Sequence, residues 1–180
     1  MILGMSLSAF TAVHVALSLT AIASGVFVVL GMLRSRQAAG LTAIFLLSTI
    51  ATSVTGFLFP SMYLGPGHLI GAVSLIVLLP TLLALYRHRL AGPWRRFYVM
   101  GAMTALYLNA VIGIWQAFGK IPFLRPLAPG LTAAPPVGAQ FAMLAIFIVL
   151  AVLAVKRFQP EIVSRGAARP RRRSWITPAA

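Results

Sequence analysis

The sequence contains no cysteine, and Glu161 is its only acidic residue. Without cysteine there is no disulfide, no iron–sulfur cluster and no thiolate nucleophile or metal ligand. One carboxylate cannot supply the paired acids of most hydrolases, the oxygen cage that holds Ca²⁺ or Mg²⁺, or a chain of acids that relays ions. These absences make an enzymatic activity the less favoured interpretation.

Charged residues make up only 9% of the 180 residues, whereas hydrophobic residues make up 60%. A soluble domain carries roughly a quarter charged residues, so this composition is typical of a membrane protein. The formal net charge of +14 could suggest a nucleic-acid partner, but such binding requires a basic folded face. Here the basic residues lie between long apolar segments, so we expect the partner to be the lipid bilayer and no nucleic acid.

Five charge-free segments approach the roughly 20 apolar residues that a helix needs to cross a bilayer. They cover residues 9–33, 39–59, 67–86, 97–118 and 137–155. The first is preceded by no basic residue and is longer than the apolar core of a secretory signal peptide, so we expect a retained span. The sequence therefore predicts an all-α membrane protein, in which residues 1–155 form a single bundle of five transmembrane helices. Residues 156–180 form a basic tail, broken by proline and poorly ordered.

The basic residues also predict an orientation. On one side of a five-span arrangement lie 13 of the 15 Lys and Arg residues, and only Lys120 and Arg125 lie on the other. Because cytoplasmic loops carry the excess of Lys and Arg, we expect the N-terminus outside and the C-terminus inside. The expected localisation is the inner (cytoplasmic) membrane of a bacterium, as a multi-pass protein. The Arg-rich tail would then attract anionic lipid headgroups.

Proline predicts where the helices are irregular. The connection 119–136 contains five prolines and cannot be one regular helix. Pro135 and Pro136 give the fifth span a stiff start, and Pro80 predicts a kink in the third span. In the second span, Thr49, Ser53, Gly56 and Pro60 form a row of small residues that we interpret as a packing surface.

Five polar side chains lie within the spans, in the half of the membrane that we expect to be the outer one. They are His14, His68, Asn109, Gln116 and Gln140. Because lipid cannot form hydrogen bonds, a polar side chain at this depth is expected to face the bundle and is a candidate for function. All five are candidate cofactor-binding residues.

His14 and His68 come from different spans at a similar expected depth. Two imidazoles from opposite sides are what axial ligation of a b-type haem requires, so both are candidate metal ligands. Small residues near them, including Gly67 and Gly71, could leave room for a flat macrocycle, although such rows are also ordinary helix packing. The alternatives are two structural histidines, or a copper, zinc or quinone site. Our preferred ligand is b-type haem or a related redox ligand.

The remaining polar residues have structural alternatives. Asn109 lies in a row of small residues spaced by four, so an interhelical hydrogen bond is the alternative to a ligand contact shared with Gln116 and Gln140. His88 lies among arginines at the expected inner boundary and is interpreted as solvated. Ser24 lies ten residues from His14, about 15 Å along one helix, which is too far for a Ser–His dyad.

Three stretches carry a resemblance. They are 14–18 (HVALS), 52–57 (TSVTGF) and 105–109 (ALYLN), the last followed by 116–118 (QAF). Together they resemble a set of small bacterial polytopic integral-membrane proteins for which no activity is established. The resemblance implies a membrane protein without assigning a reaction. Multi-helix b-type cytochromes are similar only in helix count and in the two outer histidines.

Three classes of function remain open at this point. The first is a redox or ligand-binding module that uses His14 and His68. The second is a non-catalytic accessory subunit of a larger membrane complex, or a homo-oligomer, that packs through rows of small residues. The third is a small uncoupled transporter or channel, which is disfavoured because no charged residue lies inside any predicted span.

Overall fold

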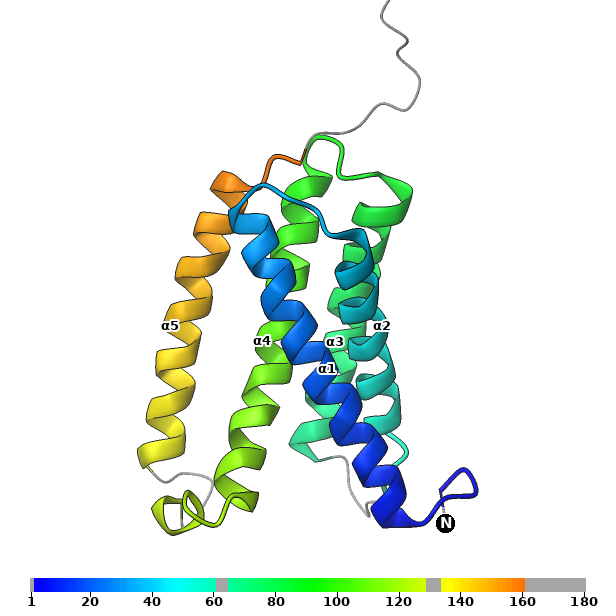
Figure 1. The fold of residues 1–180 in the computed structure, drawn as a ribbon, viewed down its shortest axis with the longest axis vertical. Coiled ribbons are helices and arrows are strands. Elements are labelled where there is room, and N and C mark those ends of the chain that lie inside the picture. The colour runs from blue at the N-terminus through cyan, green and yellow to red at the C-terminus, as the bar shows by residue number, and fades with distance from the viewer. Residues whose placement is uncertain (1, 61–64, 129–133, 161–180) are drawn as a thin grey trace, which may run out of the picture.

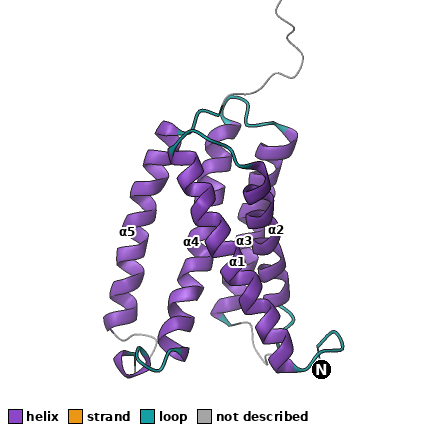
Figure 2. Cartoon of the chain, in the orientation of Figure 1, coloured by secondary structure: helices purple, strands orange, loops and turns teal. Residues whose placement is uncertain are grey.

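The computed structural model describes residues 2–60, 65–128 and 134–160. Five long helices account for most of them: α1 (Leu7–Leu33), α2 (Ala39–Gly56), α3 (Pro66–Leu82), α4 (Trp94–Lys120) and α5 (Ala134–Arg157) (Figure 1). A π-helical turn, Leu83–Arg87, continues α3, and a 3-10 turn, Arg125–Leu127, follows α4. The described residues contain helices and loops but no named strand (Figure 2).

Each of the five helices is long and apolar enough to cross a membrane, with the π turn counted as part of the third. At 1.5 Å per residue, even the 18 residues of α2 span about 27 Å, close to the thickness of a hydrocarbon core. The prediction of an all-helical protein with five candidate membrane spans is confirmed. The part of the tail from residue 161 onward, including Glu161, lies outside the described residues.

Proline determines several helix ends. Helix α2 ends at Gly56, three residues before the predicted end of its span, because Pro60 disfavours helical geometry in the residue before it. Helix α4 begins at Trp94, directly after Pro93, whose φ of −67° suits a helix start. The prolines at 135 and 136 lie inside the first turn of α5 rather than before it, where a backbone N–H has no helical partner to lose.

Pro80 lies inside α3 and lacks the N–H that would bond to the carbonyl four residues earlier. The helix widens shortly after it, where the His88 N–H donates to the Leu83 carbonyl at 3.0 Å across the π turn. The irregularity of this span therefore lies in the turns that follow Pro80.

The five helices run alternately up and down, so that eight described cations gather at one end of the bundle (Figure 1). We call it the basic end; it carries Arg34, Arg36, Arg87, Arg89, Arg95, Arg96, Lys156 and Arg157. The opposite end, where α1 begins, is the N-terminal end and carries Lys120 and Arg125. The main cluster of buried apolar side chains, which includes Met32, Leu85 and Tyr98, lies toward the basic end.

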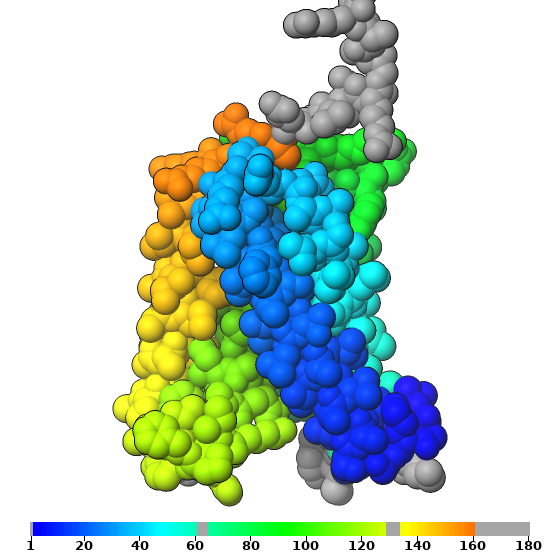
Figure 3. All heavy atoms as spheres, viewed as in Figure 1, coloured from blue at the N-terminus to red at the C-terminus, as the bar shows by residue number. Residues whose placement is uncertain are grey.

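Helix α2 lies against α1 along its length, and α3 packs on both α2 and α4. By contrast, α1 and α3 share no extensive contact. Helix α5 lies along one edge of the molecule against α4 and, to a lesser extent, α1 (Figure 3). Only Pro136 and Ala154 of α5 are buried, so most of this helix faces outward.

Two glycines allow close helix contacts. A Cβ on Gly25 of α1 would lie 2.6 Å from Leu106 Cδ1 and 2.9 Å from Phe45 Cε2, so α1, α2 and α4 meet closely here only without a side chain. Gly101 of α4 similarly lies against Thr81 of α3. Gly67, by contrast, has no atom within 4 Å of the place its Cβ would take.

Candidate functional site

Threonines of α2 form hydrogen bonds with polar side chains of the neighbouring helices. In the part of the chain that the structure describes, four side-chain hydrogen bonds join α1 or α4 to α2, and each uses a threonine. The pairs are His14–Thr55 at 2.8 Å, Ser18–Thr52 at 3.4 Å, Asn109–Thr49 at 3.3 Å and Tyr98–Thr42 at 3.5 Å. We call these four threonines the threonine stripe; it runs along α2 from the basic end toward the N-terminal end.

His14 lies about two turns inside α1, and its Nδ1 lies 2.8 Å from Thr55 Oγ1. The same hydroxyl lies 2.7 Å from the carbonyl oxygen of Ala51, which can only accept. A hydroxyl carries one hydrogen, so Thr55 donates it to Ala51 and accepts a hydrogen bond from the His14 Nδ1–H. A neutral His14 ring therefore has its lone pair on Nε2.

Aromatic side chains surround the His14 ring. Phe59 meets it edge to face, with ring centroids 5.1 Å apart, and Phe10 lies against Phe59 at 5.0 Å. His14 Cε1 lies 3.7 Å from the place a Cβ on Gly56 would take, so the ring lies close to the α2 backbone. We call His14, Thr55, Phe10 and Phe59 the His14 site.

The Nε2 atom of His14 is accessible. Among the described residues it has no hydrogen-bond partner, yet it is not one of their fully buried unpaired polar atoms. The ring is only partly buried. The site therefore presents a hydrogen-bond acceptor at the surface of the bundle.

His68 has a different role. Its Nδ1 accepts a hydrogen bond from the Gly65 N–H at 3.2 Å, which caps the start of α3. Its ring also lies 5.8 Å from that of Phe57. Because Nδ1 accepts, a neutral His68 ring carries its hydrogen on Nε2. The neutral His14 and His68 rings therefore carry their hydrogen on different nitrogens.

The described contacts do not bring the two histidines face to face. His14 contacts Thr55 and His68 contacts Phe57, and positions two residues apart point about 200° apart around a helix. Helices α1 and α3 share no extensive contact, and each imidazole contacts a different residue at the end of α2. A haem with two axial histidines needs an unprotonated nitrogen from each. The described residues do not fit a haem held by both.

Asn109 donates to Thr49 Oγ1 at 3.3 Å, the interhelical bond that was its structural alternative. Gln140 donates through Nε2 to the Val111 carbonyl at 3.0 Å and so joins α5 to α4, while its Oε1 is buried without a partner. Gln116 is exposed on α4. His14 and Asn109 both reach the threonine stripe, but at positions six residues apart, about 9 Å along α2.

Sequence reasoning missed Thr55 and Phe59 as neighbours of His14 and Thr52 as the partner of Ser18. The signal for the two threonines is the spacing of the threonine stripe at 42, 49, 52 and 55, in steps of seven, three and three residues, which follows one side of a helix. The row interpreted as packing, which included Thr49 and Ser53, is spaced by four, three and four residues, and beyond Thr49 it lies on the neighbouring face. Gly71 of α3 approaches α2 on that face, near the Ser53 carbonyl and the Phe57 ring.

No protein-family model, curated protein or solved structure matches the chain.

Proposed function

We propose that this integral membrane protein binds a lipid-soluble hydroquinone or phenol at the His14 site. The observation that carries the proposal is that Thr55 Oγ1 contacts both His14 Nδ1 and the Ala51 carbonyl, from which we infer the tautomer of His14. Thr55 accepts from Nδ1, so Nε2 is left as an accessible acceptor that suits a hydroxyl donor. The ligand hydroxyl donates a hydrogen bond to Nε2 and stays protonated. The corresponding quinone has only acceptor oxygens and cannot make this bond.

The surroundings of His14 support an aromatic ligand of this kind. Phe59 and Phe10 offer ring edges and faces beside the imidazole, and each aromatic contact contributes about 0.5–1.5 kcal/mol beyond burial. A ligand dissolved in the lipid could enter from the side, because most of the outer surface of α1 is apolar.

A metal ion is less well supported by the same donors. A lone pair on Nε2 can ligate copper or zinc, but a stable site needs further ligands. The described residues contain no group of three His, Cys, Asp or Glu side chains close enough to share an ion. A redox ligand held by a hydrogen bond therefore agrees better with this set of donors than a ligated metal does.

The test compares three forms of one short-chain compound against protein in nanodiscs: the hydroquinone, its quinone and its dimethyl ether. We expect the hydroquinone to bind at least about fivefold more tightly than the other two, since a hydrogen bond to an otherwise unpaired polar group accounts for about 1–3 kcal/mol. His14→Ala should remove this preference. His88→Ala, a histidine at the basic end, is the matched control and should retain it. Equal affinity for all three compounds would contradict the proposal.

We also propose that the basic end faces the cytoplasm of a bacterial cell and the His14 site lies in the outer half of the inner membrane. The eight described cations of the basic end, against Lys120 and Arg125 at the other end, support this orientation. Because the chain has no cysteine, single cysteines at Phe123 and Ala91, both exposed, provide the test. An impermeant maleimide added to intact spheroplasts should label Phe123→Cys and spare Ala91→Cys; the reverse pattern would contradict this orientation.

One observation supports the accessory-subunit alternative. Only Pro136 and Ala154 of α5 are fully buried, and the exposed face of the helix is available to a neighbouring helix. For a homo-oligomer, the mass of the protein in several detergents should be a constant multiple of 19.2 kDa. A monomer throughout would remove the homo-oligomer from consideration.

A further inference from the structure

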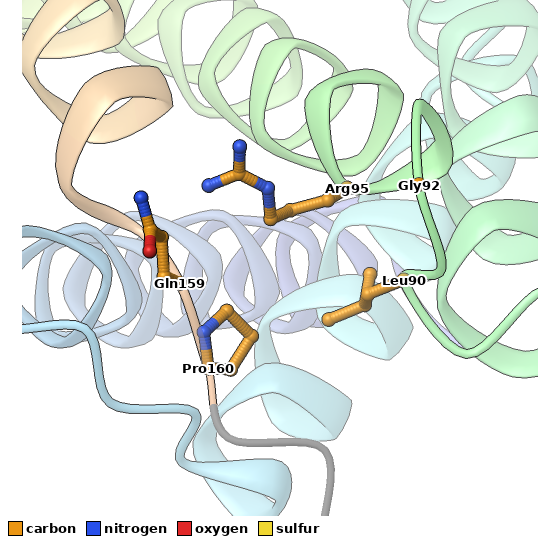
Figure 4. A pocket seen from close by; sticks show the side chains of 5 residues that line it. All are labelled: Leu90, Gly92, Arg95, Gln159 and Pro160. Carbon is orange, nitrogen blue, oxygen red and sulfur yellow. The ribbon is translucent and has the colours of Figure 1, made fainter.

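A pocket of about 360 Å³ lies at the basic end, at the opposite end of the bundle from the His14 site. It is lined by Leu90, Gly92, Arg95, Gln159 and Pro160, which belong to the α3–α4 connection, the first turn of α4 and the segment that follows α5. The side chains of Arg95 and Gln159 extend toward the same part of the pocket, and those of Leu90 and Pro160 line another part (Figure 4). The pocket therefore has one polar wall and one apolar wall.

One side of the pocket is formed by the turn between α3 and α4, which contains Leu90 and Gly92. Leu90 has a positive φ of 61° and Gly92 one of 53°, so the chain turns sharply here. The Leu90 N–H donates to the Ala84 carbonyl at 2.9 Å, and the Leu90 side chain is buried. This side of the pocket is thus ordered by the protein's own packing.

The other side of the pocket is formed by the segment that follows α5, and contacts of this segment hold it in place. Phe158 is fully buried and its ring lies 5.9 Å from that of Tyr98. The Gln159 N–H donates to Ser35 Oγ at 2.8 Å, which ties this segment to the α1–α2 loop. Arg95 Nη1 donates to the Phe158 carbonyl across the pocket. Both sides of the pocket are therefore ordered without a ligand, which lowers the entropic cost of binding.

The charge of Arg95 is not neutralised by the described residues. They contain no Asp or Glu, since the only carboxylate side chain, Glu161, lies outside them. A guanidinium has five N–H donors, and the Phe158 carbonyl is the one acceptor it has among the described residues. The remaining donors suit an oxyanion, and the other cations of the basic end raise the local positive potential around it.

We propose that this pocket binds a phosphate group. The planar fork of Arg95 can donate to two phosphate oxygens at once, and the Gln159 amide lies on the same polar wall to donate to a third. The apolar wall of Leu90 and Pro160 suits the carbon part of a phosphate ester. This inference is independent of the ligand proposed for the His14 site.

The experiment measures how tightly the full-length protein retains phosphatidylglycerol, by native mass spectrometry from nanodiscs that mix it with phosphatidylcholine. Arg95→Gln should weaken retention by roughly tenfold, because it removes a charge-assisted bidentate contact. Arg96→Gln removes the same charge from the next, exposed residue and should change retention by less than about twofold. Equal effects of the two variants would overturn the proposal, since they would indicate only diffuse attraction to the basic end.

Two further variants test whether the effect of Arg95→Gln comes from altered folding, and whether the carboxylate of Glu161 occupies the pocket. Gln159→Ala keeps the backbone bond to Ser35 and should weaken retention by several-fold with unchanged thermal unfolding; unchanged retention would count against the pocket. If Glu161→Gln raised retention more than about tenfold, the chain's own carboxylate would be the occupant, and the proposal would be overturned.

Competition distinguishes the source of the phosphate. Glycerol 3-phosphate or inorganic phosphate that displaces the lipid at millimolar concentration, with loss of the effect in Arg95→Gln, would identify a soluble phosphate ligand. Lipid retention that soluble phosphates do not reduce would identify a phospholipid headgroup. Both results support a phosphate site, whereas the absence of Arg95-dependent binding in both arms would refute it.

Discussion

Replacement of Gly25 by alanine tests the helix packing that orients the His14 helix. The new methyl carbon would lie 2.6 Å from Leu106 Cδ1 and 2.9 Å from Phe45 Cε2, whereas carbon atoms in contact lie about 3.5–4.0 Å apart. Leu106 and Phe45 are 2% and 1% exposed, so neither side chain can swing into open space. Helix α1 would have to move away from α2 and α4.

The expected cost follows from two opposing terms. Overpacking a tight core costs about 1–3 kcal/mol, while the change from glycine to alanine within a helix returns about 0.5–1 kcal/mol. We therefore expect Gly25→Ala to lower the free energy of unfolding by about 1 kcal/mol, and by at most about 2.5 kcal/mol, in reversible unfolding by SDS in mixed micelles. Gly67→Ala is the matched control, because no atom lies within 4 Å of its new methyl, and it should be neutral or stabilising. If Gly25→Ala were as stable as Gly67→Ala, the packing of α1 against α2 and α4 would be wrong.

Three further predictions concern the threonine stripe and the histidines. Thr49→Val removes the partner of Asn109 and should lower the free energy of unfolding by about 0.6–1.7 kcal/mol, whereas Thr49→Ser should not; equal effects would refute the bond. Thr55→Val leaves the Nδ1–H of His14 without its acceptor, so hydroquinone affinity should fall several-fold, and Thr55→Ser should restore it. His68→Ala should leave that affinity within about twofold and speed amide exchange at the start of α3; a loss of binding as large as that of His14→Ala would mean that both histidines serve one ligand.

The five long helices could be predicted because the bilayer imposes a direct requirement on the length of each apolar segment. Helix ends were less accurate, and several of the errors lie at prolines. Pro93 and Pro135 are compatible with the first turn of a helix and extend α4 and α5 beyond their charge-free segments, while Pro60 shortens α2. A count of apolar residues does not contain this information.

The partner of His14 could not be predicted because it depends on how α1 and α2 are rotated about their axes. That rotation is determined by packing at Gly25 and Phe45, which local sequence does not reveal. Equal depth of two histidines along their helices does not determine which way their side chains point: His14 contacts Thr55 of α2, whereas His68 caps the start of α3. The pocket at the basic end was missed for a related reason, since it joins Leu90 and Arg95 to Gln159 from a distant part of the chain.

The central claim is that His14 presents an unprotonated Nε2 that accepts a hydrogen bond from a hydroxyl ligand. The most direct measurement is nitrogen NMR of the protein in nanodiscs with ¹⁵N-labelled histidine rings, in which His14→Gln assigns the resonances. We predict a protonated Nδ1 and an unprotonated Nε2 for His14, and a shift of the Nε2 resonance when the hydroquinone is added but not when its dimethyl ether is. A proton on Nε2 of the free protein, or the same shift with both compounds, would contradict the account.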